Sequence, residues 1–88
     1  MLYNENDFES IDLDEETEIK RQLMDCLLNK FQEGFEIYNC CVNNNENKIY
    51  YCYCGYEDGD TFYVKVNFND DSLSEIDDDE LRDIIFYC

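Results

Sequence analysis

The sequence contains no histidine and no proline, and only six of its 88 residues are basic. Histidine is the side chain that most often acts as general base, so its absence removes the usual means of acid–base catalysis. No Pro-rich or Gly/Ser-rich linker divides the chain, and we predict one domain, 1–88, with 1–11 as an arm. No apolar run approaches the roughly 20 residues that a membrane-spanning helix needs.

Motifs of known catalytic sites are absent as well. The chain has no nucleophile elbow, no glycine-rich phosphate loop and no metal-binding motif of a hydrolase. Carboxylates are abundant, but no pair stands out as an acid and its base, and mutual repulsion is the simpler consequence of their density. We therefore expect a protein that is not an enzyme and that needs no cofactor.

The start of the chain and the cysteines bear on the compartment. Met1-Leu2-Tyr3-Asn4-Glu5 lacks the basic start and the apolar stretch of a secretion signal. Without such a signal, the six cysteines are expected to be free thiols in a reducing environment rather than disulfides. The predicted location is a cytoplasm, that of the host cell if a phage encodes the protein.

Charge is the feature in which this sequence departs most from an ordinary domain. It has 23 acidic and six basic residues, a net charge of -17. Nucleic acid and anionic membranes are disfavoured as direct ligands, because both bind through basic patches. A basic partner protein is favoured. The alternative is an acidic surface that serves only to interact with water.

An amphipathic helix is predicted over residues 15–33. Its apolar residues recur every four positions, and Gly34 stands where such a helix would end. Asp12 and Glu15 have the spacing of a capping box in its aspartate form. The apolar stripe consists of Ile19, Leu23, Leu27 and Phe31.

The middle of the chain changes to the alternating pattern of strands. Residues 61–68 place Phe62, Val64, Val66 and Phe68 on one face. Asp58-Gly59 predicts a two-residue hairpin turn that joins them to a strand over 48–56. A third strand is expected over 35–42.

The two-residue turn sets a pairing in which Tyr53 faces Val64 and Tyr51 faces Val66. Tyr50 and Tyr63 then lie on the sheet face away from the core, and Tyr38 is a candidate to join them. These rings are either covered, by the arm or a second copy, or exposed as part of an interface, where tyrosine is enriched.

The end of the chain predicts a second, shorter helix. Asp77 and Glu80 have capping-box spacing, and Ile76 and Leu81 match a hydrophobic staple. The predicted fold class is therefore α+β, with an N-terminal helix, a three-stranded antiparallel sheet and a short C-terminal helix. The apolar face of this helix consists of Leu81, Ile84, Ile85 and Cys88.

This order of elements brings many acids to one pole of the molecule, where we predict partner binding. Carboxylates three or four apart on a helix lie about 5–6 Å from each other, the scale of phosphate spacing along a nucleic-acid strand. Helix capping alone requires only one or two acids per helix, so the excess favours binding over capping. The predicted partner-binding residues are Asp70, Asp71, Glu75, Asp77, Asp78, Asp79, Glu80, Asp12, Asp14, Glu15 and Glu16, with Glu46 at the same pole.

Cysteines provide a competing prediction. Alternation places Cys52 and Cys54 on one strand face, and Cys40 joins them across the loop between the strands. Three thiolates and a fourth ligand would suit zinc. No Cys-x-x-Cys pair accompanies them, and reduced cysteine is more often a small apolar core residue. We therefore predict no metal, and keep a cysteine-based metal-binding module as an alternative.

The helix–three strands–helix order, the small size, and the acids of Asp70-Asp71 and Asp77-Asp78-Asp79-Glu80 resemble small phage anti-CRISPR proteins. The resemblance covers residues 15–87 as architecture. It implies an inhibitor that occupies the nucleic-acid-binding groove of a CRISPR effector nuclease by imitating DNA. An immunity-type protein that neutralises a basic toxin nuclease shares the same charge logic and remains an alternative.

Overall fold

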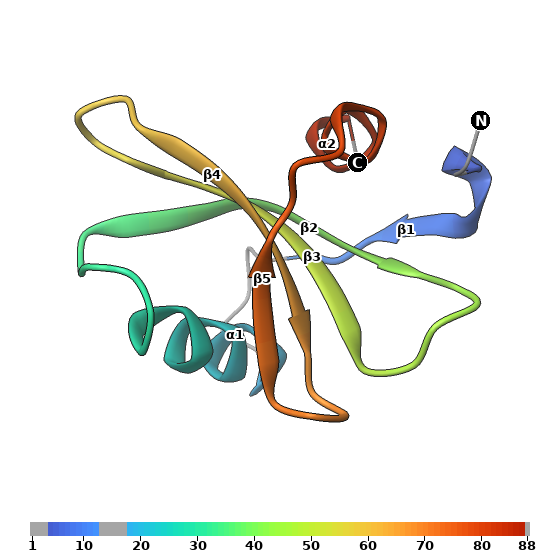
Figure 1. The fold of residues 1–88 in the computed structure, drawn as a ribbon, viewed down its shortest axis with the longest axis horizontal. Coiled ribbons are helices and arrows are strands. Elements are labelled where there is room, and N and C mark those ends of the chain that lie inside the picture. Colours follow the sequence, from blue (N-terminus) through green and yellow to red (C-terminus); the bar gives the residue numbers. More distant parts are fainter. Residues whose placement is uncertain (1–3, 13–17, 88) are drawn as a thin grey trace.

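The computed structural model describes residues 4–12 and 18–87, which form a five-stranded antiparallel sheet with one α-helix on each face (Figure 1). The strands lie in the sheet in chain order, β1-β2-β3-β4-β5. No helix among the described residues is long and apolar enough to cross a membrane. The strands are β1 (Phe8–Ser10), β2 (Phe35–Asn43), β3 (Ile49–Tyr56), β4 (Thr61–Asn67) and β5 (Ser72–Glu75). The helices are the short 3-10 helix η1 (Glu5–Asp7), α1 (Glu18–Leu28) and α2 (Asp79–Phe86).

The predicted sheet of three strands behind an N-terminal helix is wrong, because two further strands flank it. β1 lies within the segment 1–11 predicted as an arm, and it pairs with the end of β2, where Phe8 is opposite Asn43. β5 pairs with β4, where Leu73 is opposite Val66. Both strands are short and mostly polar, so they carry no alternating apolar pattern. Main-chain hydrogen bonds to longer neighbours hold them in the sheet.

The first face of the sheet is covered by α1. Leu23 and Leu27 are fully buried against Cys52, Val64 and Val66 of the central strands. Burying a leucine side chain contributes about 1.5–3 kcal/mol. The four-residue spacing predicted from the sequence therefore does locate the face of this helix that builds the core.

The bounds of this helix differ from the predicted 15–33. α1 ends at Leu28, and Phe31 beyond it stacks on Phe62 of β4 with ring centroids 4.3 Å apart. Gly34, with a φ of 103°, turns the chain into β2. The aromatic contact thus belongs to the connection rather than to the helix. The predicted start at residue 15 lies outside the described residues.

The other face of the sheet is covered by α2. Leu81 and Ile85 of this helix pack with Tyr51, Ile76 and Cys41 in a second, smaller core. Ile85 and Cys41 are fully buried, and the other three are nearly so. The single apolar layer predicted from the sequence is therefore two layers, one on each side of the sheet.

The pairing of β3 with β4 differs by one residue from the prediction. Cys52 lies opposite Val64 and Tyr53 lies opposite Tyr63, whereas the sequence predicted Tyr53 opposite Val64. A shift of one residue moves every side chain of a strand to the other face. Tyr53 therefore points toward α2, and Tyr50, predicted to lie away from the core, packs on the α1 side instead.

The cause of this shift is the length of the β3–β4 turn. The N–H of Tyr56 donates to the carbonyl of Asp60 at 2.8 Å, and the N–H of Gly59 donates to the carbonyl of Tyr56 at 3.0 Å. Three residues, 57–59, therefore form the loop instead of two. Gly59 has a φ of 101°, the left-handed conformation that a three-residue hairpin loop requires at its end.

β2 is irregular between Ile37 and Asn39, where Tyr38 is the extra residue. The Nδ2 of Asn39 donates to the carbonyl of Phe86 at 2.8 Å and so holds the end of α2 against the sheet. The ring of Tyr38 lies over Gly55 of β3. A Cβ atom on Gly55 would come within 2.5 Å of that ring, so the absence of a side chain there makes room for Tyr38.

Candidate functional site

The acidic sequence 77–80 surrounds the start of α2, and its members have different roles. Oδ1 of Asp78 accepts the N–H groups of Glu80 at 2.9 Å and Leu81 at 3.2 Å. Asp78 is therefore the N-cap, one residue later than the Asp77 predicted from the capping-box spacing. Such a cap contributes about 1 kcal/mol to helix stability. The main role of Asp78 in this structure is to hold the helix.

Asp77 and Asp79, on either side of the cap, are almost fully exposed, with 96% and 97% of each side chain accessible. Arg82 lies 3.6 Å from Asp77 and 3.8 Å from Asp79. Its Nε also donates to the carbonyl of Ile76 at 2.8 Å, which orients the guanidinium between the two carboxylates. Exposed ion pairs contribute about 0–1 kcal/mol, so a partner can compete for both carboxylates at little cost.

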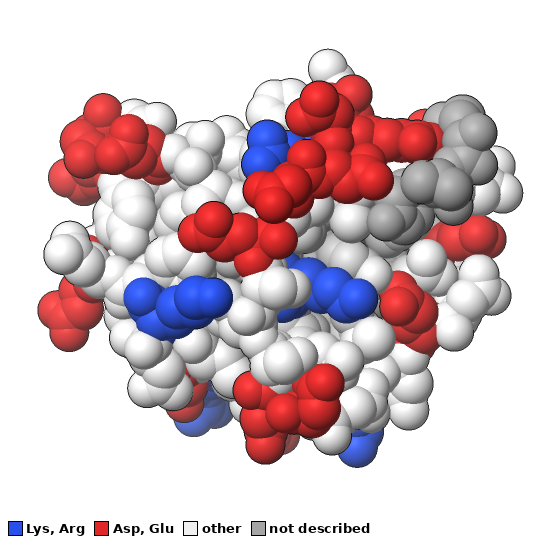
Figure 2. Space-filling model, in the orientation of Figure 1, with Lys and Arg blue, Asp and Glu red and all other residues white. Residues whose placement is uncertain are grey.

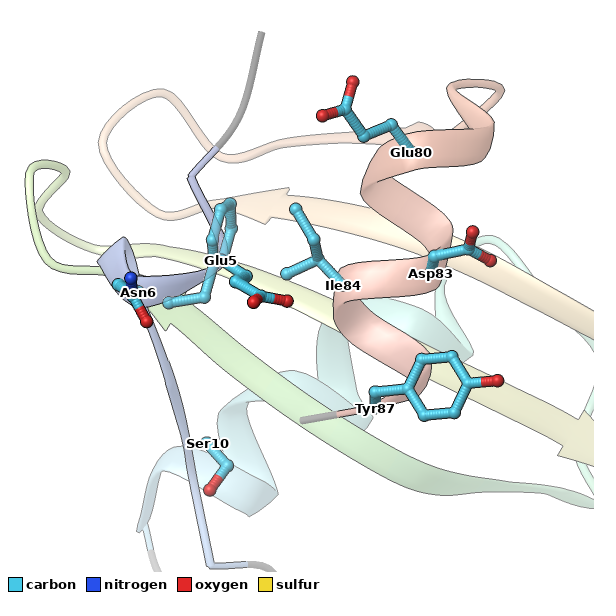
Figure 3. A pocket seen from close by; sticks show the side chains of 8 residues that line it. Glu5, Asn6, Ser10, Glu80, Asp83, Ile84 and Tyr87 are labelled. Atoms are coloured by element: carbon cyan, nitrogen blue, oxygen red, sulfur yellow. The ribbon is translucent and has the colours of Figure 1, made fainter. Parts of the chain in front are cut away.

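A groove with a volume of about 520 Å³ lies between the N-terminal segment and α2 (Figure 3). Three carboxylates line it, Glu5 from η1 and Glu80 and Asp83 from α2. Figure 3 shows Glu5 and Ile84 facing each other across the groove. The remaining lining residues are Asn6, Phe8, Ser10 and Tyr87.

Apolar and anionic side chains line this groove together. Phe8 and Ile84 supply apolar surface, and Oε1 of Glu80 is buried with no hydrogen-bond partner among the described residues. A lysine or arginine side chain has an apolar stem and a cationic head. The groove is therefore suited to receive a basic side chain of another protein.

Two of the predicted partner-binding acids, Asp70 and Asp71, lie in the β4–β5 turn. The N–H of Ser72 donates to Oδ1 of Asp70 at 3.1 Å. Hydrogen bonds from the side chain and the N–H of Ser72 lower the pKa of the Asp70 carboxyl. Asp71 lines a pocket with Ile19 and Cys26 of α1. Burial, followed by the charge of Asp71, raises the pKa of the Cys26 thiol. This turn is thus associated with the α1 side of the sheet.

The other predicted acids are dispersed. Glu75 ends β5 and is exposed, as is Asp12 after β1. Glu46 accepts a hydrogen bond from the Tyr51 hydroxyl at 2.6 Å. Asp14, Glu15 and Glu16 lie outside the described residues.

Among the residues that the structure describes, the predicted acids therefore do not come together at one pole. Figure 2 shows acidic side chains in separate groups, over α2 and at the turns, with basic side chains between some of them. The four-residue strand β5 separates the β4–β5 turn from the start of α2 by about 13 Å of extended chain. It also leads the chain from the turn beside α1 to the face that α2 covers.

Of the eight residues that line the groove, only Glu80 is among the predicted partner-binding residues, and the two other carboxylates, Glu5 and Asp83, are not. Asp83 follows Glu80 by three positions, so helical spacing could have identified it. Glu5 reaches the groove only because β1 pairs with β2, which no pattern in the sequence indicated.

Cys40, Cys52 and Cys54 share one face of the sheet, as predicted, and all three are buried. This is the α1 face, with Val64 and Val66, whereas the predicted pairing placed the cysteines on the opposite face from these valines. Sγ of Cys52 lies 3.6 Å from Sγ of Cys40. Burial, followed by the charge of Cys40, raises the pKa of Cys54 to about 12. A hydrogen bond with Cys40 and burial raise the pKa of Cys52 as well. These shifts favour neutral thiols, whereas metals bind thiolates. Among residues 4–12 and 18–87, no three His, Cys, Asp or Glu side chains are arranged to hold a metal ion.

No protein-family model matches this chain, and neither a curated protein nor a solved structure matches it. The features of the chain that bear on its function are its negative charge, the groove beside α2 and the exposed carboxylates around that groove.

Proposed function

We propose that this protein is a non-catalytic inhibitor that binds the nucleic-acid-binding groove of a basic protein in place of the nucleic acid. The proposed target is a nuclease. The predicted three-stranded order, which was part of the resemblance to anti-CRISPR proteins, is wrong, so a CRISPR effector is suggested only by the small size and by the acids at 70–71 and 77–80. The observation that carries the proposal is the unbalanced charge. If each of the six basic side chains neutralised one carboxylate, a net charge of -17 would still remain.

The arrangement of carboxylates on α2 supports this proposal. Asp79 and Asp83 are four residues apart on the helix, and Glu80 and Asp83 are three apart. Their Cβ atoms are therefore about 5–6 Å from each other. A groove that binds nucleic acid follows the phosphates with lysine and arginine side chains. The carboxylates on α2 would present to the lysine and arginine side chains of such a groove a series of negative groups spaced similarly to the phosphates.

Electrostatic attraction would bring the two proteins together. Complementary charge raises association rates above those of neutral pairs, and the increase falls with ionic strength. The screening length is about 10 Å at 0.1 M salt. We therefore expect fast, salt-sensitive binding that oligonucleotides compete with.

The test begins with the immobilised protein and a lysate of a bacterium that carries nuclease-based defence. A retained nuclease that a DNA or RNA oligonucleotide elutes at constant salt is then purified, and its cleavage rate is measured with and without this protein. The test variant carries Asp77→Asn, Asp79→Asn and Asp83→Asn, which leave the Asp78 cap in place. Because it removes three charges from the α2 surface, we expect weaker inhibition.

A matched control carries Glu33→Gln, Glu57→Gln and Asp60→Asn, which remove the same charge from exposed positions away from α2. Equal effects of the two triple variants would show that net charge alone matters and would contradict a role for the α2 surface. A retained nuclease that oligonucleotides do not displace would favour the immunity-type alternative, in which the inhibitor binds outside the nucleic-acid groove.

A further inference from the structure

Four aromatic rings lie together on the α2 face of the sheet. Tyr38, Tyr53 and Tyr63 come from three neighbouring strands, and Phe86 comes from α2. The ring of Tyr53 is central, with centroid distances of 5.4 Å to Tyr38, 4.6 Å to Tyr63 and 5.5 Å to Phe86. We refer to these four residues as the aromatic cluster.

Two members of the aromatic cluster present their rings to solvent. Tyr38 is 47% exposed and Phe86 is 46% exposed. The β2 irregularity and the missing side chain at Gly55 place Tyr38 in this position. Tyr87, 81% exposed, contacts Phe86 with centroids 5.0 Å apart and also lines the acidic groove. The aromatic cluster is therefore continuous with the groove.

The chain already places a guanidinium at the edge of this cluster. The guanidinium carbon of Arg82 lies 5.7 Å from the centroid of the Tyr63 ring, between Asp77 and Asp79. An arginine over an aromatic ring with carboxylates beside it is a favourable arrangement, because the ring face attracts the cation. Arg82 shows how a guanidinium is accommodated on this surface.

Two exposed acidic side chains lie near the aromatic cluster. Glu36 pairs with Gly55, over which the ring of Tyr38 lies, and it also lines a pocket with Lys20 and Arg21 of α1. Asp83 is exposed and close enough to Tyr63 for its charge to raise the pKa of that phenol, behind burial and the neighbouring Tyr53. The cluster thus combines ring faces with negative charge.

We propose that the aromatic cluster is a docking surface for arginine side chains of a cationic partner protein. A guanidinium would stack on the exposed ring of Tyr38 or Phe86, with its charge balanced by Glu36 or Asp83. Arginine suits this surface better than lysine, because its planar group stacks on rings and is more weakly hydrated. This inference rests on the proposed function, since it specifies how the basic partner is recognised.

Charge decides against two other occupants of this surface. A second copy of the chain would bring together two molecules that each carry a net charge of -17. The bases of a nucleic acid would stack on the rings, but their phosphates would be repelled by the same carboxylates. A cationic protein segment is the occupant that both the rings and the charge favour.

The test uses an arginine homopeptide and a lysine homopeptide of equal length and a dye label. Their dissociation constants are measured by fluorescence anisotropy at about 50 mM and 200 mM salt. The variants are Tyr38→Leu, Tyr38→Phe and, on the helix, Phe86→Leu, each checked for folding by circular dichroism. Because Tyr38→Phe keeps the ring and loses only the hydroxyl, it is the matched control for Tyr38→Leu.

We expect Tyr38→Leu and Phe86→Leu each to weaken arginine-peptide binding by roughly two- to fivefold, the effect of one exposed cation–ring contact. Binding of the lysine peptide should change less, and Tyr38→Phe should bind both peptides as the parent does. Equal losses for the two peptides, or no loss in either leucine variant, would overturn the docking of arginine while leaving the proposed function intact. Failure of the parent protein to bind either peptide at low salt would overturn both.

Discussion

Replacing Asp78 separates its structural role from those of the neighbouring acids. Asp78→Ala leaves the N–H groups of Glu80 and Leu81 without the acceptor they have at 2.9 and 3.2 Å. Loss of an N-cap costs about 1 kcal/mol, within a range of about 0.5–2 kcal/mol. For a domain of this size, 1 kcal/mol corresponds to a decrease in Tm of about 4–8 °C.

Thermal unfolding followed by circular dichroism measures this effect against three matched variants. Asp78→Asn keeps an oxygen at the capping position and should unfold close to the parent. Asp77→Asn and Asp79→Asn remove a charge of the same size from almost fully exposed side chains, whose pairs with Arg82 are long. Because each of these long, exposed pairs is expected to contribute about 0.5 kcal/mol or less, both variants should unfold within about 2–4 °C of the parent.

The expected order of Tm therefore places Asp78→Ala alone at the bottom. If Asp78→Asn were as unstable as Asp78→Ala, the charge of Asp78 rather than its hydrogen bonds would stabilise the helix. If Asp77→Ala lowered Tm more than Asp78→Ala, the helix would begin where the capping-box spacing predicts, and the assignment of the cap would be wrong.

Two further predictions follow from the core. Gly55→Ala should destabilise the protein by about 1–3 kcal/mol in urea unfolding, because the new methyl group meets the Tyr38 ring at 2.5 Å. Adding Tyr38→Ala should restore most of the lost stability. If the double variant is no more stable than Gly55→Ala, the contact with Tyr38 is not the cause. Burial raises the pKa of Cys54 to about 12 from 9.0, so the unfolded chain releases this proton first as pH rises. The contribution of the protonated Cys54 thiol to the free energy of unfolding is complete below pH 9 and is lost as the pH rises toward 12. Urea unfolding at a series of pH values should detect this decrease in stability, and the decrease should be smaller in Cys54→Ala.

The sequence predicted those parts of the fold that have a period and a sufficient length. The four-residue spacing of Leu23 and Leu27 identifies the buried face of α1, and the alternation of Val64 and Val66 identifies the buried face of β4. β1 and β5 have three and four residues and depend on pairing with their neighbours. β1 and β5 are strands because their main chains form hydrogen bonds with β2 and β4, and not because of a pattern in their own side chains.

The candidate site was predicted only in part, for a related reason. Carboxylates close in sequence, such as Asp77 and Asp79, do lie together beside α2. To predict which distant acids lie near Asp77 and Asp79, the path of the chain between them must be known. The predicted order of elements lacked β5, which determines that path. Asp70 and Asp71 consequently lie beside α1, while Glu5 lies beside α2.

The three-residue loop that ends at Gly59 links the core to the surface. Its length sets the pairing in which Cys52 lies opposite Val64 and Tyr53 lies opposite Tyr63. With a loop shorter by one residue, Tyr53 would face the α1 core in place of the smaller, fully buried Cys52, and the packing around Leu23 and Leu27 would have to change to take the larger side chain. One register of β3 against β4 therefore places Cys52 and Cys54 on the α1 face and Tyr53 and Tyr63 on the α2 face. The aromatic cluster that we propose to bind arginine thus depends on the conformation of Gly59, in the loop that joins Tyr53 to Tyr63.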